Sequence, residues 1–180
     1  GIEMSSIKEP DFFSDLALQR KGSYYGKRRV DTIEKYNTLF TKRDNILRGE
    51  ASVSYLYYDD VPKKIKTYNP DAKIIIVLRN PIDRAFSHYL MDYRLGLISE
   101  SFDSIIKKES KHKNAELYYQ QYISVGEYAV QVDRYIDAFG KDNLLILDYE
   151  DFNNNISHVM QRICSFLSVD DNFFPNFRNK

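Results

Sequence analysis

Two short stretches of the chain are continuously apolar, and each leads into a segment with helical periodicity. The first covers residues 73–78 and is rich in isoleucine. It ends at Arg79, and apolar side chains then recur every three or four residues from Ile82 to Tyr93. A short apolar run without alternation predicts a strand covered on both faces, and the recurrence predicts an amphipathic helix.

The C-terminal third repeats this order of elements. Residues 143–148 form the second apolar run, and helical stripes cover residues 128–139 and 156–167. Gly140 follows the first of these helices as a suitable C-terminal stop. Strands that alternate with helices over short connections predict an α/β fold, in which helices flank a central parallel sheet.

Two further helices are predicted upstream. Asp31 and Glu34 have capping-box spacing before the apolar face of a helix over residues 32–40. Asp60, followed by Val61 and Pro62, marks the start of another helix, because proline is tolerated in the first turn. The Asn-Pro-Asp sequence at residues 69–71 would end it.

Composition narrows the class of protein. A length of 180 residues with 43% apolar content suits one domain, and 26 basic residues balance 26 acidic ones. A neutral chain has no overall attraction to nucleic acid or to acidic membranes, so we expect neither partner. No apolar run reaches the roughly 18 residues of a membrane span. The single Cys164 forms no internal disulfide, which favours a reducing, cytoplasmic location.

The clearest candidate chemistry lies where the first predicted strand ends. Arg79 leaves the strand there, and the next helix begins with unpaired backbone N–H groups. Arg84 and Ser87 are three residues apart and would share a polar flank of this helix. Guanidinium, hydroxyl and N–H donors together suit a phosphate. Alternatively, Arg79 pairs with a carboxylate and Ser87 is only a small helix residue.

These residues resemble a known motif. Arg79, Pro81, Arg84 and Ser87 match the 3′-phosphate-binding motif of sulfotransferases. Residues 8–13 read Lys-Glu-Pro-Asp-Phe-Phe and resemble the Lys-Glu-Pro-x-Phe-Phe segment of the heparan-sulfate-like branch. Residues 49–55 are similar to its Gly-Glu-Lys-x-Pro-x-Tyr segment, and the similarity continues through residues 126–128 and 149–152. The resemblance implies a three-layer, P-loop-like fold.

The resemblance also implies a reaction and its residues. The donor would be 3′-phosphoadenosine 5′-phosphosulfate, with Arg79, Arg84 and Ser87 at its 3′-phosphate and no metal. Glu9 would be the general base, although a surface carboxylate beside Lys8 is the plainer interpretation of its sequence. Asp11 and Glu50 would contact the acceptor, a carbohydrate or a small molecule. The resemblance does not specify the oligomeric state.

Two departures from the family pattern qualify these expectations. The Gly-x-x-Lys-x-Gly-Thr-Thr loop that wraps the 5′-phosphosulfate is missing from the sequence, and so is a late glycine-rich segment. We therefore expect a single domain over residues 1–180 that is incomplete at both ends and binds nucleotide poorly. Ala51 and Val53 stand where close relatives carry Lys and Pro, which suggests a different acceptor.

Other interpretations stay open at this point. A nucleotide kinase would require a Gly-x-x-x-x-Gly-Lys-Ser/Thr loop and a magnesium carboxylate, and neither is evident. A non-catalytic remnant of the domain is a third possibility. A basic run at Arg20, Lys21 and residues 27–29 could border a groove for an anionic acceptor, but a solvated loop is the commoner outcome. Six tyrosines could line a pocket, although core packing is expected for most: Tyr55, Tyr57, Tyr58, Tyr118, Tyr119 and Tyr122.

Overall fold

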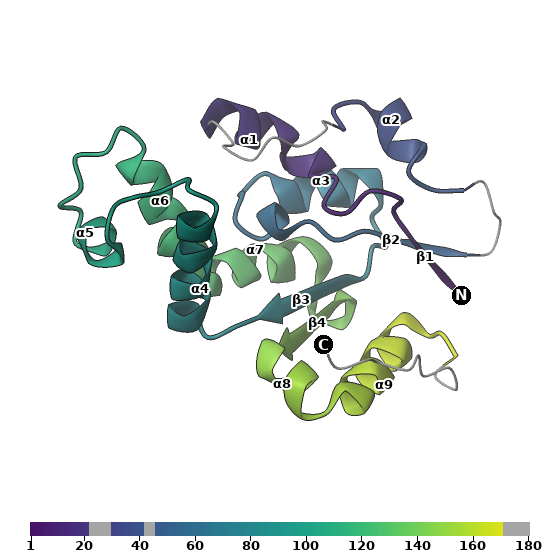
Figure 1. Cartoon of the computed structure of the whole chain (residues 1–180). Coiled ribbons are helices and arrows are strands. Elements are labelled where there is room, and N and C mark those ends of the chain that lie inside the picture. The colour runs from purple at the N-terminus through teal and green to yellow at the C-terminus, as the bar shows by residue number, and fades with distance from the viewer. Residues whose placement is uncertain (22–29, 42–45, 171–180) are drawn as a thin grey trace.

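A computed structural model of the chain describes residues 1–21, 30–41 and 46–170 (Figure 1). Its helices and strands are, in chain order, β1 (Ile2–Met4), η1 (Phe12–Ser14), α1 (Asp15–Lys21), α2 (Ile33–Asn37), β2 (Leu47–Gly49), η2 (Val53–Tyr55), α3 (Val61–Tyr68), β3 (Ile74–Leu78), α4 (Pro81–Arg94), α5 (Phe102–Ile106), α6 (Ala115–Tyr122), η3 (Ser124–Gly126), α7 (Tyr128–Phe139), η4 (Lys141–Asn143), β4 (Leu144–Asp148), α8 (Tyr149–Asn154) and α9 (Ile156–Leu167).

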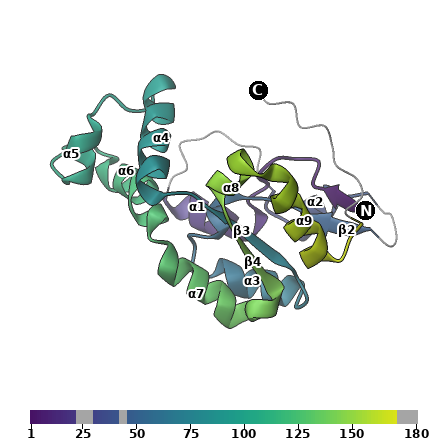
Figure 2. The same cartoon turned by 90° about the horizontal axis from the view of Figure 1, so that it is seen from below.

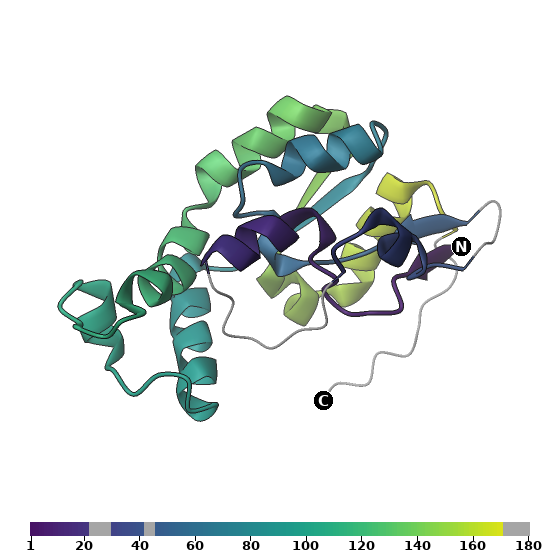
Figure 3. The same cartoon turned by 90° about the horizontal axis from the view of Figure 1, so that it is seen from above.

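The strands form two parallel pairs with helices around them. β1 pairs with β2, and β3 pairs with β4 from Ile74 opposite Leu144 to Leu78 opposite Asp148. α3 and α7 lie on one side of β3 and β4, and α8 and α9 lie on the other (Figures 2 and 3). The predicted α/β fold with parallel strands is confirmed, with the described strands divided between two sheets.

The apolar strands are covered on different faces. Ile76 of β3 is buried against Tyr135 and Phe139 of α7. Leu147 of β4 is also buried, whereas its partner in the register, Val77, remains 45% exposed. The two continuous apolar runs therefore correspond to β3 and β4, but the cover over their second face is only partial.

Most predicted helix ends are confirmed. α3 begins at Val61, and α7 ends at Phe139 before Gly140, whose φ is 75°. The expected capping box is wrong, because Thr32 rather than Asp31 caps α2 by accepting from the Lys35 N–H. Asp31 instead forms an ion pair with Lys35 at 2.6 Å, and the helix stops at Asn37.

α4, α5 and α6 form a lobe at one end of the molecule (Figure 1). Its core contains Ala85 of α4, Ile105 of α5, and Tyr118 and Tyr122 of α6. The core role expected for tyrosines is confirmed for Tyr118 and Tyr122 here and for Tyr58 beneath α3. Within the described ranges, every helix is too short or too polar to cross a bilayer.

Candidate active site

The ends of two neighbouring strands bring Arg79 and Tyr149 together. Leu78 lies opposite Asp148 in the register, so the next residue of each strand emerges at the same edge. The Arg79 guanidinium carbon lies 5.2 Å from the centre of the Tyr149 ring. An aromatic ring attracts a cation that lies over its face, so the Tyr149 ring helps to orient the Arg79 guanidinium. Tyr149 belongs to the similar segment at residues 149–152, but its contact with Arg79 follows only from the strand register.

The backbone at the start of α4 is less available to a ligand than the sequence suggested. The Asn80 side chain accepts from the Ile82 N–H at 2.9 Å and from the Asp83 N–H at 3.4 Å. Two of the expected free donors are therefore already occupied by the helix cap. An anion at this helix end depends mainly on side chains.

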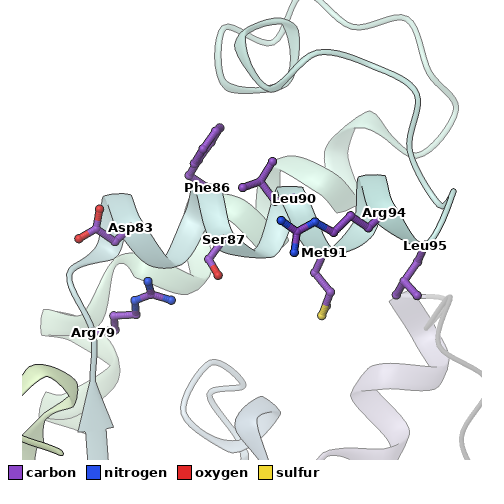
Figure 4. A pocket seen from close by; sticks show the side chains of 8 residues that line it. All are labelled: Arg79, Asp83, Phe86, Ser87, Leu90, Met91, Arg94 and Leu95. Carbon is purple, nitrogen blue, oxygen red and sulfur yellow. The ribbon is translucent and has the colours of Figure 1, made fainter. Parts of the chain in front are cut away.

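A cavity of about 580 Å³ runs along the outer face of α4. Its lining consists of Arg79, Asp83, Phe86, Ser87, Leu90, Met91, Arg94 and Leu95. Figure 4 shows the Arg79 guanidinium and the Ser87 hydroxyl directed into the same space, with the Asp83 carboxylate pointing away. The structure thus brings together the two residues on which the predicted phosphate site depends.

Both polar groups have free hydrogen-bonding capacity. Nε of Arg79 is buried and has no hydrogen-bond partner among the described residues. Ser87 is exposed and lines the cavity, and its hydroxyl has no side-chain hydrogen bond among the described residues. A buried donor without a partner is costly unless a ligand or water satisfies it. Donors of this kind at one cavity match the oxygen acceptors of a phosphate.

Arg84 does not share this cavity, so the predicted common flank with Ser87 is wrong. Its guanidinium turns inward and donates to the backbone oxygens of Gln121, at 3.0 Å, and Tyr122. Burial lowers the pKa of Arg84, and a hydrogen bond to Tyr128 partly opposes that shift. Arg84 therefore holds α4 against the end of α6.

Gly126 explains why this junction is tight. A Cβ added there would lie 3.2 Å from the Pro81 Cβ and 3.7 Å from a terminal nitrogen of Arg84. Such a contact is closer than ordinary van der Waals packing, so a larger residue would push η3 away from α4. The glycine of the 126–128 motif therefore permits the close approach of these two elements.

The segment that carries Glu9 follows β1 and has an unusual backbone. Glu9 has φ 52° and Asp11 has φ 53°, in the left-handed region that non-glycine residues rarely adopt. The Asp11 N–H donates to the Ser52 Oγ at 3.0 Å, and the Ser54 hydroxyl donates to the Asp11 Oδ1 at 2.6 Å. Asp11 is only 8% exposed. Its carboxylate is thus part of a loop anchor, and the predicted contact of Asp11 with an acceptor stays a prediction.

Glu50 lies at the carboxyl end of β2, beside this segment. The pKa of Glu50 is raised to about 7, mainly because the carboxyl group is buried; a hydrogen bond from Tyr55 lowers the pKa, and the nearby Asp11 charge raises it. Its Oε2 is buried and lacks a hydrogen-bond partner among the described residues. A carboxyl group whose pKa is close to neutrality can exchange a proton near physiological pH.

The predicted residues thus fall into two groups. Arg79 and Ser87 line the cavity on α4, whereas Glu9, Asp11 and Glu50 follow the ends of β1 and β2. Among the described residues, no three His, Cys, Asp or Glu side chains gather as metal ligands. Residues 27–29 of the basic run lie outside the described residues.

The chain is similar to known proteins both in sequence and in fold. The family profile described as "Sulfotransferase domain" matches residues 13–173. The fold is similar to the crystal structure of a sulfotransferase from Alicyclobacillus acidocaldarius, with a TM-score of 0.81 and 30% sequence identity. That likeness covers 99% of this chain and 76% of the other.

Two curated relatives extend the comparison. The bifunctional heparan sulfate N-deacetylase/N-sulfotransferase 4 of Mus musculus is 25% identical over 177 residues, covering 94% of this chain and 20% of that protein. Carbohydrate sulfotransferase 15 of the same species is 24% identical over 220 residues, covering 93% and 39%. The chain therefore spans less than half the length of these relatives. Because the family profile covers nearly all of it, the chain belongs to the sulfotransferase domain family.

Proposed function

We propose that this protein transfers a sulfuryl group from 3′-phosphoadenosine 5′-phosphosulfate to a hydroxyl or amine of a carbohydrate or small molecule. The observation that carries the proposal is the cavity into which Arg79 and Ser87 both point (Figure 4). Family membership supports it, because members are described as sulfotransferases.

The donor's 3′-phosphate fits the groups present at this cavity. The guanidinium of Arg79 offers charged donors, including an Nε that the protein leaves unpaired. Ser87 offers a neutral donor from the second turn of α4, and the Tyr149 ring contacts the Arg79 guanidinium. Arg94, which also lines the cavity, adds positive charge at its far end. The proposed role of Arg84 is indirect, through the position of α4.

The chemistry requires removal of one proton from the acceptor. As the acceptor oxygen or nitrogen bonds to sulfur, the bond from sulfur to the bridging phosphate oxygen breaks. The Glu9 carboxylate takes the acceptor proton, and 3′-phosphoadenosine 5′-phosphate leaves with the bridging oxygen. Donor groups around the transferred sulfuryl group and the leaving oxygen would stabilise the charge that develops there.

The acceptor is proposed from the relatives and from the residues near Glu9. The names of the matched relatives refer to heparan sulfate and carbohydrate, and we extend that acceptor class to this chain. Glu50, with one carboxylate oxygen unpaired, is the candidate contact for an acceptor hydroxyl or amine. Ala51 and Val53 replace the Lys and Pro of the resembling motif, so a different glycan or a small molecule is proposed. We place the activity in the cytoplasm, because the single cysteine favours a reducing compartment.

The variant Glu9→Gln tests the proposed base. It should reduce sulfuryl transfer about 100-fold or more, because a positioned base contributes that much. Binding of 3′-phosphoadenosine 5′-phosphate should be unchanged. Transfer would be measured with labelled donor and a panel of oligosaccharides and small alcohols or amines. Glu116→Gln, on the exposed side of α6, is the matched control. A Glu9→Gln enzyme that transfers at the wild-type rate would show that another group is the base.

A further inference from the structure

The segment from Glu9 to Ser14 is held in a conformation that it would not adopt alone. Two of its non-glycine residues, Glu9 and Asp11, have left-handed backbone angles. Such residues persist where surrounding contacts compensate for the backbone strain, and they gather at functional sites. The contacts that hold this segment therefore also determine the position of Glu9.

Those contacts come from one short turn that follows β2. The Tyr55 hydroxyl accepts from the Phe13 N–H at 3.2 Å. Ser54 donates to the Asp11 carboxylate at 2.6 Å and shares a 2.7 Å hydrogen bond with Ser14. These bonds join residues about forty positions apart in the sequence. A second element adds one more contact, since Lys64 of α3 donates to the Phe13 backbone oxygen at 3.0 Å.

Tyr55 is the centre of this anchor. Its ring packs edge-on against Phe13, with 5.6 Å between ring centres. Burial raises the pKa of Tyr55, so its hydroxyl stays protonated and can donate to Glu50 while accepting from the Phe13 N–H. Glu50 in turn is faced by Asp11, Tyr36, Tyr55 and Tyr135. Tyr55 thus links Glu50 to the Glu9–Ser14 segment, and Ser54 links the Asp11 carboxylate of that segment to the turn after β2.

We propose that Tyr55 and Ser54 are positioning residues, which act through Phe13 and Asp11 to hold the Glu9 segment ready for proton removal. The inference rests on the proposed function, because it takes Glu9 as the base. Neither residue needs to touch the donor or the acceptor. Their contribution is to fix the base before the acceptor arrives, so that less ordering remains for the transition state.

Tyr55→Phe tests this directly, since it keeps the ring and removes only the hydroxyl. We expect kcat to fall about 10-fold, with the affinity for 3′-phosphoadenosine 5′-phosphate and the donor KM unchanged, because only the geometry of the base is disturbed. Tyr68→Phe is the matched control. Its ring also packs against Phe13, at 5.6 Å, but its hydroxyl donates to Asn37.

A second readout separates local positioning from general stability. In Tyr55→Phe, amide hydrogen exchange should accelerate at Phe13 and Ser14, while the helices keep their protection. Ser54→Ala should reproduce the kinetic defect, and Ser54→Thr, which retains a hydroxyl, should restore most of kcat. If Tyr55→Phe does not fold, the Ser54 pair decides the question.

The outcomes distinguish the two proposals. Wild-type kcat in both Tyr55→Phe and Ser54→Ala, alongside inactive Glu9→Gln, would overturn the positioning role and leave the proposed function standing. An active Glu9→Gln enzyme would instead remove the proposed base. Loss of transfer in Glu50→Gln with full activity in Tyr55→Phe would also overturn the inference, because Glu50 would then act without this anchor.

Discussion

The two faces of α4 treat their polar groups in opposite ways. On the inner face, Arg84 donates to two backbone oxygens at the end of α6, and the buried Asp92 accepts from Tyr122 at 2.8 Å. On the outer face, Ser87 and Arg94 line an open cavity together with Arg79, which precedes the helix. On the inner face both terminal nitrogens of Arg84 are paired within the protein, and only its buried Nε lacks a partner among the described residues. On the outer face the polar side chains remain directed toward the cavity.

Whether a polar side chain is hydrogen-bonded within the protein distinguishes structural residues from candidate binding residues better than the residue type does. Arg79 and Arg84 are five positions apart and carry the same group, yet only Arg79 leaves charged donors facing a cavity. Buried polar groups in folded proteins are nearly always paired, so a group that is left unpaired at a cavity is a candidate for a ligand. The inner face should therefore control stability and the outer face binding.

The largest expected effect is on the inner face. Arg84→Met should lower the free energy of unfolding by about 3 kcal/mol, because two partly buried backbone oxygens lose their charged donor. Urea denaturation measures this. Arg162→Met is the control, since Arg162 donates to the Ile146 oxygen in an exposed setting, and should cost about 0.5 kcal/mol or less. Equal losses in both variants would break the comparison.

The next effect belongs to the Tyr122 hydroxyl. Tyr122→Phe removes the 2.8 Å hydrogen bond to Asp92, which is fully buried. We expect about 2 kcal/mol lower stability, because a buried carboxylate loses a donor. Nucleotide affinity of the folded protein should not change. A marked loss of affinity without loss of stability would show that the inner face contributes to binding.

Ser87→Ala should have the converse effect. Loss of one hydrogen bond to a phosphate should weaken binding of 3′-phosphoadenosine 5′-phosphate about 10-fold, or about 1.4 kcal/mol. Unfolding should be unaffected, because the hydroxyl has no bond within the described protein. Calorimetry provides the affinity, and Ser165→Ala on the exposed side of α9 provides the control. Unchanged affinity would exclude Ser87 from the anion site.

The smallest effect concerns pH and the inner face. Burial lowers the pKa of His88, Arg84 lowers it further, and Asp92 and the Gln121 backbone oxygen oppose the shift. Because the pKa of His88 is lower in the folded than in the unfolded protein, protonation favours the unfolded state. The contribution of neutral His88 to the free energy of unfolding is therefore complete above about pH 6.5, the ordinary pKa of histidine, and is lost as the pH falls below that value. His88→Gln should show a weaker loss of stability between pH 7 and 5. An unchanged pH profile would contradict this assignment.

The sequence predicted β3, β4 and the helices α2, α3, α4, α7 and α9, but not the β1–β2 pair or the helices α5, α6 and α8. β3, α4 and the Arg79–Ser87 pair follow from local periodicity and motif spacing. The separation of Arg84 from Ser87 could not be predicted, because a long side chain selects its acceptors from α6, which is distant in the sequence. The burial of Asp11 likewise depends on Ser52 and Ser54, about forty residues away.

Other features were missed because they require the strand register or a choice between neighbours. Tyr149 meets Arg79 only because Leu78 lies opposite Asp148. Asp31 and Thr32 can both cap a helix, and the backbone extension at Thr32 decides between them. The raised pKa of Glu50 comes from burial beside Tyr55, a tertiary effect that spacing alone does not encode.

The central claim is that the outer face of α4 binds an anion through Arg79. Calorimetric titration of 3′-phosphoadenosine 5′-phosphate into the wild-type protein and Arg79→Ala tests it most directly. We predict that Arg79→Ala weakens binding at least about 100-fold while the unfolding midpoint is retained, because paired charged hydrogen bonds to the phosphate are lost. Equal affinity in the two proteins would contradict the assignment of this cavity to the donor.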